Sequence, residues 1–233
     1  MPIQHAKSYP FFIPETSYVL DQDGWREHPG HANKDRVSKD HLHGVIASGS
    51  NASPDQLEHK FKGHEQLLKY PIYVTRGQLH DFESVYSAHF TSYGSVPATL
   101  ASAIGAITDV FVTWLNDDQL ARMHETESIG VNYDYVQMPN IKLRLETGDL
   151  LQSAYAYLSK RGSLSQHGKP ISLKAMSQEQ VLRYAKSQVT STTKSLDDFI
   201  LALIKSPQTR AKYTRRLAQK ACPMTKATNT INP

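Results

Sequence analysis

The run Ile107–Leu115, "ITDVFVTWL", constrains the fold more than any other segment of the chain. Apolar and β-branched residues dominate it, as is typical of a strand that other parts of a protein cover on both faces. A buried strand needs hydrogen-bonded neighbours, and strand-like segments precede and follow it: "IYVTRGQL", "SVYSAHFTSYG", "VPATLA", "YDYVQM", "IKLRLE" and "LLQSAYAYLS". The sequence therefore predicts a sheet in which this run is a central strand.

Helix signals lie between and after these strands. Ser53 and Gln56 form an S-x-x-Q capping box around Pro54, which predicts a helix from Pro54 to about Lys69. Asn116 is the predicted cap of the next helix. "SLSQHGKPISL" is typical of a loop or hairpin, and three helical segments follow it. They are "SQEQVLRYAKSQV", which opens with an S-x-x-Q capping box at Ser177, "SLDDFILALIKS", which opens with a serine cap at Ser195, and "TRAKYTRRLAQKA". The predicted fold class is therefore α+β, a mixture of strands and helices.

Length and composition exclude several classes of protein. A chain of 233 residues fits one domain with appendages, and residues 1–40, which show no sustained period, are expected to form an irregular arm. No apolar run approaches the roughly 18 residues that cross a bilayer. We expect no secretory signal at the N-terminus, where "MPIQHAKSYPFFIP" has one lysine and too short an apolar stretch. Cys222 is the only cysteine, so no intramolecular disulfide can form. We expect a cytoplasmic protein without a membrane partner.

The positive charge is concentrated near the C-terminus. The formal net charge is +4, and the segment "KSPQTRAKYTRRLAQKA" carries six cations and no acid. Such a segment can contact nucleic acid or an acidic partner. No aromatic platform or base-reading motif accompanies it, so a solvated helix face is the favoured interpretation and nucleic acid is an unlikely partner.

Four histidines raise the question of a metal site. His28, His31, His41 and His43 lie in "HPGH" and "HLH", with no cysteine and no helical pair four residues apart. Scattered surface histidines are the favoured interpretation, and no metal site is predicted.

Glu127 is the first candidate for chemistry. In the segment "LARMHETE", Met123 and Glu127 lie on the same helical stripe as Leu120, whereas Glu125 points away. Burial of the Glu127 carboxylate is expected to raise its pKa, which suits a general base that works near neutral pH. Two alternatives stay open: the helix ends before Glu127, or an arginine pairs with its carboxylate.

The joint between a short strand and the helix at Pro54 is the second candidate. In "SGSNA", Gly49 lets a ligand approach the backbone, while backbone N–H groups and the Ser50 and Asn51 side chains can donate to a carboxylate or an oxyanion. A simple strand-to-helix turn with Asx chemistry is the alternative. A phosphate-binding loop is disfavoured because G-K-[ST] is missing and Asp55 places negative charge in the first helical turn.

Several segments, in this order, resemble the gamma-glutamylcyclotransferase-like (AIG2-like) family. The family's Tyr-Gly-Ser-Asn loop is similar to Ser48-Gly49-Ser50-Asn51, and "ASPDQL" follows it as in many members. Further on, the matching segments are "GQLHDF", "GSVPATL", "DVFVTWL", "LARMHETE" and "NYDYV". The resemblance covers about Val45 to Leu158, and it departs from the family at Ser48, where the loop tyrosine and its aromatic wall are missing.

The resemblance implies a fold, a reaction and a set of site residues. The fold would be a small β-barrel with surrounding helices, formed by residues 41–175, with residues 176–233 as a helical extension packed on it. The reaction would release 5-oxoproline from a γ-glutamyl amine, peptide or related conjugate without a cofactor. Glu127 would be the general acid/base, and the implied substrate-binding residues are Ser48, Gly49, Ser50, Asn51, Ala52, Tyr133 and, less directly, Tyr157 or Tyr155.

Three other interpretations stay open. The chain can be a non-catalytic binding or regulatory protein of the same fold, because fold does not determine function. It can instead be another amide-cleaving or acyl-transfer enzyme with Ser50 as nucleophile, although no G-x-S-x-G elbow surrounds Ser50. The third is a nucleic-acid-associated protein that uses the basic C-terminal helix. The sequence leaves the oligomeric state open, with a homodimer as one possibility.

Overall fold

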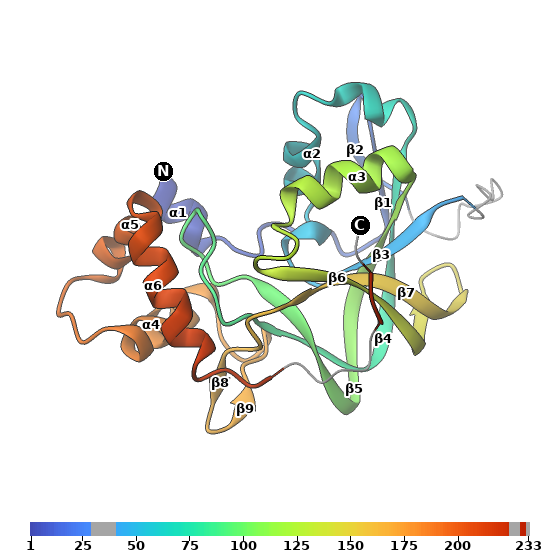
Figure 1. Ribbon diagram of the computed structural model, residues 1–233. Helices are drawn as coiled ribbons and strands as arrows, with labels where there is room; N and C mark the ends of the chain where they lie inside the picture. The colour runs from blue at the N-terminus through green and yellow to red at the C-terminus, as the bar shows by residue number, and fades with distance from the viewer. Residues whose placement is uncertain (29–40, 224–228, 232–233) are drawn as a thin grey trace.

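A five-stranded β-barrel lies at the centre of the computed structural model, which describes residues 1–28, 41–223 and 229–231 (Figure 1). The main sheet has the order β10-β6-β7-β3-β5-β4-β1-β2, and an additional β6–β4 pairing closes β6, β7, β3, β5 and β4 into a ring. The strands are β1 (Tyr18–Asp21), β2 (Gly24–Glu27), β3 (His43–Ala47), β4 (Ile72–Tyr86), β5 (Ala98–Leu115), β6 (Tyr133–Leu145), β7 (Leu150–Ser159), β8 (Ser165–Gln166), β9 (Lys169–Pro170) and β10 (Asn229–Thr230).

Helices surround this barrel, and the expected α+β class with a small barrel and a C-terminal helical extension is confirmed. The helices are α1 (Pro2–Lys7), α2 (Pro54–Phe61), α3 (Asp117–Thr126), α4 (Gln178–Val189), α5 (Leu196–Lys205) and α6 (Pro207–Ala218), with short 3-10 turns η2 (Ser50–Ala52) and η3 (Glu65–Lys69). The segment expected to be a loop or hairpin contains the β8–β9 hairpin.

The predicted central strand is the C-terminal half of β5, which pairs with β3 on one side and β4 on the other. Val110, Val112 and Trp114 pack in one hydrophobic cluster, and Phe111 and Leu115 pack in another. Alternate residues of the run therefore enter two cores on opposite faces of the sheet. This explains why the run is apolar throughout instead of alternating with polar residues.

Three of the four helix caps predicted from the sequence are present in the structure. Asn116 and Ser177 form complete capping boxes with the glutamines three residues later, and the Ser195 hydroxyl accepts the Asp198 N–H. Ser53 does not cap α2: its buried hydroxyl has no hydrogen-bond partner within the described ranges. The predicted helix to Lys69 is also wrong, because α2 ends at Phe61 and Gly63 adopts a left-handed φ of 79° before η3 begins.

The N-terminal segment is more regular than the irregular arm that the sequence predicts. It contains α1 and the β1–β2 hairpin, and β1 adds to the sheet by antiparallel pairing with β4, with Leu20 opposite Ile72. Residues Tyr18, Val19 and Leu20 are almost fully buried. A four-residue strand is too short to show a period in sequence, and its pairing depends on the distant edge of β4.

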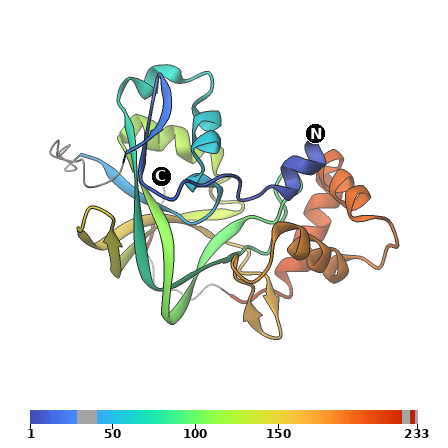
Figure 2. The same cartoon turned by 180° about the vertical axis from the view of Figure 1, so that it is seen from behind.

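Helix α1 and the helices α4–α6 meet in a second core beside the barrel. Helices α4, α5 and α6 pack together, and α1 joins them, with Ala6 fully buried in the same cluster (Figure 2). The Lys7 ammonium lies 2.7 Å from a carboxylate oxygen of Asp197 on α5. The C-terminal helices therefore hold α1 in place, directly before the chain runs to the barrel.

In the part of the chain that the structure describes, no helix combines the length and the apolar character needed to cross a membrane.

Candidate active site

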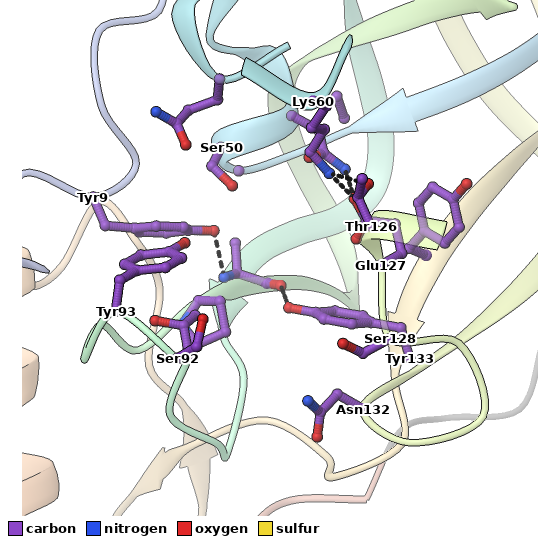
Figure 3. A pocket seen from close by; sticks show the side chains of 18 of the residues that line it. Tyr9, Ser50, Lys60, Ser92, Tyr93, Thr126, Glu127, Ser128, Asn132 and Tyr133 are labelled. Atoms are coloured by element: carbon purple, nitrogen blue, oxygen red, sulfur yellow. Dashed lines mark hydrogen bonds and ion pairs between the residues drawn. The ribbon is translucent and has the colours of Figure 1, made fainter. Parts of the chain in front are cut away.

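A cavity of about 770 Å³ lies beside the loop that follows β3 (Figure 3). Its walls come from this loop, from α2, from the C-terminal end of α3, from the segment before β5 and from the start of β6. The sequence-predicted residues that line it are Ser48, Gly49, Ser50, Asn51, Glu127, Tyr133 and Tyr157. Segments far apart in the sequence therefore meet around one space, as a substrate site requires.

Ala52 and Tyr155 are the exceptions among the candidate residues. Ala52 is buried in the core, where its carbonyl accepts a hydrogen bond from the Tyr18 hydroxyl at 3.2 Å. It is not among the residues that line the cavity. Tyr155 stacks on Tyr135 with ring centroids 5.1 Å apart, so Tyr157 is the cavity residue of the two.

Glu127 lies directly against the loop, as the periodicity of α3 indicates. Its side chain is 9% exposed, and its Oε1 accepts a hydrogen bond from Asn51 Nδ2 at 2.9 Å. Helix α3 ends at Thr126, and Glu127 is the C-cap residue that follows it, with φ −94° and ψ 0°. The helix therefore does end before Glu127, yet the carboxylate still faces the cavity (Figure 3).

The charge partner of Glu127 is a lysine that the sequence reasoning missed. Lys60 Nζ forms an ion pair with Oε1 of Glu127 and a 3.0 Å hydrogen bond to Thr126 Oγ1. An arginine does not take this place, because Arg122 pairs with the exposed Glu125. Lys60 lies three residues after the buried Leu57, so it shares the helix face that packs against the core. A lysine on such a face is the sequence signal that could have identified a buried charge partner.

The ion pair leads to a first prediction, for stability. The Lys60 and Glu127 side chains are 16% and 9% exposed, so removing either charge leaves the other poorly solvated. We expect Lys60→Met and Glu127→Gln each to lower the free energy of unfolding by about 1–3 kcal/mol. The double variant is expected to lose less unfolding free energy than the two single variants lose together. The expected coupling energy is about 1–2 kcal/mol, measured by urea unfolding. Additive losses would show that the two groups do not interact.

Two tyrosines bind the backbone of Ala98 at the cavity wall, one at its N–H and the other at its carbonyl. The Ala98 N–H donates to the Tyr9 hydroxyl at 2.6 Å, and the Tyr133 hydroxyl donates to the Ala98 carbonyl at 3.1 Å (Figure 3). Burial raises the pKa of Tyr9 to about 12 and the pKa of Tyr133 well above its ordinary value. Both hydroxyls therefore remain protonated and able to donate hydrogen bonds at neutral pH.

Tyr9 and Tyr93 also line the cavity, and no sequence motif predicts either of them. Tyr93 lies beside Tyr9, so two rings form one wall opposite the Glu127 carboxylate (Figure 3). On the other side, Tyr157 contacts His124 Nδ1 through its hydroxyl at 2.9 Å. No local motif marks Tyr9, because its position depends on how the N-terminal segment packs.

His89 lies deep in the cavity wall and leads to a second prediction. It is 2% exposed, its Nδ1 lies 2.7 Å from the Ser87 hydroxyl, and burial followed by the Arg161 charge lowers its pKa to about 3. The unfolded chain binds a proton near pH 6.5 that the folded chain excludes until about pH 3. Stability therefore falls as the pH drops through this window, by up to about 1.4 kcal/mol per pH unit.

Replacing His89 should remove this pH dependence. Between pH 6 and pH 4, we expect His89→Gln to lose about 2–3 kcal/mol less unfolding free energy than the original chain does, as measured by urea denaturation at each pH. If the unfolding free energies of both proteins fall equally between pH 6 and pH 4, the folded state does accept a proton at His89.

The structure offers no metal-binding cluster within residues 1–28, 41–223 and 229–231, where no three His, Cys, Asp or Glu side chains are grouped suitably. His43 instead lies 2.7 Å from an Asp117 carboxylate oxygen. His31, one of the four histidines considered from the sequence, lies outside these residues.

No protein-family model matches the chain, and no curated protein is found to match it. Among solved structures, a gamma-glutamyl cyclotransferase is 16% identical over 70% of this chain and 98% of its own, with a TM-score of 0.40. The chain is similar to this enzyme. An uncharacterized protein from Homo sapiens is 15% identical over 82% of this chain and 94% of its own, with a TM-score of 0.40.

A protein from Arabidopsis thaliana is also similar, at 15% identity and a TM-score of 0.36. The match covers 51% of this chain and 62% of the Arabidopsis chain, which is less than two thirds of that protein. These similar structures include the enzyme type that the sequence motifs resemble, and none of them assigns an activity to this chain.

Proposed function

We propose that this protein releases 5-oxoproline from a γ-glutamyl amine, peptide or related conjugate, with Glu127 as general acid/base. One observation carries the proposal: a buried carboxylate at the cavity is hydrogen-bonded to the Asn51 side chain of the glycine-bearing loop. A proton acceptor thus lies against the loop whose N–H groups are the candidate donors to the oxyanion of an intramolecular acyl transfer.

The first step is proton removal from the substrate. The α-ammonium of the γ-glutamyl group gives a proton to Glu127, and the resulting amine attacks the γ-carbonyl carbon of the same molecule. The new C–N bond closes a five-membered ring, and the carbonyl oxygen becomes an oxyanion. Because nucleophile and electrophile belong to one molecule, the protein mainly has to hold the ring-closing conformer.

The second step expels the attached amine. Glu127 returns the proton to the leaving nitrogen, the original amide C–N bond breaks, and the oxyanion reforms the carbonyl. The ring nitrogen still carries two hydrogens after the attack and gives one of them to solvent, while the released amine takes up a proton, which leaves the neutral lactam of 5-oxoproline. The candidate donors for the oxyanion are the N–H groups of the Gly49–Asn51 loop. The loop is shaped by the η2 turn, in which the Ala52 N–H donates to the Gly49 carbonyl at 2.9 Å. Loss of one such donor typically costs on the order of a hundredfold in rate.

A screen of γ-glutamyl compounds tests the proposal. Purified protein is incubated with γ-glutamyl dipeptides, γ-glutamylamines and larger γ-glutamyl peptides, and released 5-oxoproline is measured by mass spectrometry. We expect release from at least one class and none without protein. Absence of release across the panel, with a folded protein, would contradict the proposed enzyme.

A second candidate function is a non-catalytic binding protein of the same fold, and Lys60 is the observation that favours it. Its ammonium already contacts the Glu127 oxygen that Asn51 also binds. A substrate ammonium must therefore share or replace this contact before Glu127 can accept a proton. Calorimetric binding of 5-oxoproline or glutamate by a protein that never releases 5-oxoproline would favour this candidate over the enzyme.

A further inference from the structure

The N-terminal segment reaches into the candidate active site through Tyr9. This residue follows α1, is 5% exposed and lines the cavity. Its hydroxyl accepts the Ala98 N–H at 2.6 Å and lies against the loop at Gly49, where a Cβ atom would be only 2.3 Å from the hydroxyl oxygen. A residue near the chain start therefore touches the centre of the loop that faces Glu127.

Two further contacts hold the segment before Tyr9 in position. The Ala6 carbonyl, at the buried end of α1, accepts a hydrogen bond from the Ser95 hydroxyl at 2.8 Å. Lys7 forms the ion pair with Asp197 of α5, and α1 lies against this helix in both views (Figures 1 and 2). The helices after residue 176 thus fix the path of the N-terminal segment toward the cavity.

The Tyr9 hydroxyl is directed to the loop by donors on the protein. Burial raises the pKa of Tyr9 to about 12, although hydrogen bonds from the Ala98 N–H, the Ser50 backbone and the Ser50 side chain act in the opposite direction. The phenol therefore stays protonated. A phenolic oxygen that accepts protein N–H groups keeps its own hydrogen to donate to a ligand oxygen.

We propose that Tyr9 is a substrate-binding residue of this site, which supplies from the N-terminal segment the aromatic wall that the loop lacks at Ser48. Its hydroxyl donates to an oxygen of the γ-glutamyl head beside the Gly49–Asn51 loop, and its ring, with Tyr93, covers the aliphatic part of that head. The role of α4–α6 is to hold α1 so that Tyr9 stays in this place. The inference rests on the proposed function.

Two variants of Tyr9 in the 233-residue chain separate the effect of the hydroxyl from the effect of the ring. With a substrate found in the γ-glutamyl screen, Tyr9→Phe is expected to raise KM about 10-fold, because it keeps the ring and loses the donated hydrogen bond. Tyr9→Ala is expected to lower kcat/KM about 100-fold or more. Calorimetry with 5-oxoproline should show weaker binding in the same order.

Phe12→Ala is the matched control, because Phe12 belongs to the same segment, is 59% exposed and does not line the cavity. Its KM and kcat should stay within about twofold of the original chain. If the original protein turns over substrate but a folded Tyr9→Phe variant keeps its KM and its 5-oxoproline affinity, the assignment of the Tyr9 hydroxyl is wrong. An original chain that neither binds nor releases 5-oxoproline would overturn the proposed function, and this inference with it.

Discussion

Glu127→Gln is expected to abolish the release of 5-oxoproline. The amide has nearly the same shape as the carboxylate and its oxygen can still accept the Asn51 hydrogen bond, but it cannot take a proton from an ammonium group. General-base catalysis contributes roughly 10²–10⁴ in rate, so we expect kcat to fall at least a hundredfold. The measurement is steady-state release of 5-oxoproline, with circular dichroism to confirm that the variant is folded.

Glu125→Gln provides a matched control for this loss. Glu125 lies two residues earlier in α3, its side chain is 64% exposed, and it pairs with Arg122 at 2.8 Å instead of facing the cavity. The same chemical change there should leave kcat and KM within about twofold. If both variants retain most of the activity, Glu127 is not the proton acceptor and the proposed mechanism fails.

The sequence could predict those parts of the fold that depend on neighbouring residues. The two-faced burial of β5 follows from an unbroken apolar run, and the caps at Asn116 and Ser177 depend on groups only three residues apart. The direction of Glu127 follows from the period of α3, even though the helix ends just before it. Each of these features is set within one turn or one strand, so local spacing is sufficient.

The missed site residues depend on packing between distant segments. Tyr9 reaches Ala98 across 89 positions and Lys60 reaches Glu127 across 67. No local pattern contains these contacts, because they form only after the barrel closes and α1 joins the C-terminal helices.

The loop and the N-terminal segment depend on each other through Gly49, and this leads to the second large effect. Gly49 has φ −146° and ψ −138°, so a left-handed backbone is not the reason for a glycine here. The reason is space: a Cβ atom would lie 2.3 Å from the Tyr9 hydroxyl oxygen and 2.7 Å from Ala98 Cβ. Both neighbours are themselves fixed by the Tyr9–Ala98 hydrogen bond, so neither can move away freely.

Gly49→Ala is therefore expected to damage both the fold and the chemistry. Overpacking of this kind typically costs about 1–3 kcal/mol of unfolding free energy, which urea denaturation measures directly. Displacement of Ser50 and Asn51 would move the proposed oxyanion donors away from the substrate, so we expect kcat/KM to fall on the order of a hundredfold.

The Tyr9→Phe background tests whether the Tyr9 hydroxyl causes the steric clash with a Cβ atom at position 49. Without that oxygen, the closest contact of the new methyl group disappears and the Ala98 contact remains. We therefore expect Gly49→Ala to destabilise the Tyr9→Phe protein by about half as much as it destabilises the original chain, which a double-mutant cycle in urea resolves. Equal destabilisation in both backgrounds would show that the loop shifts away from Tyr9 and that the Tyr9 hydroxyl does not clash with the new methyl group. In that case, the packing of the N-terminal segment would not explain why a glycine stands between Ser48 and Ser50.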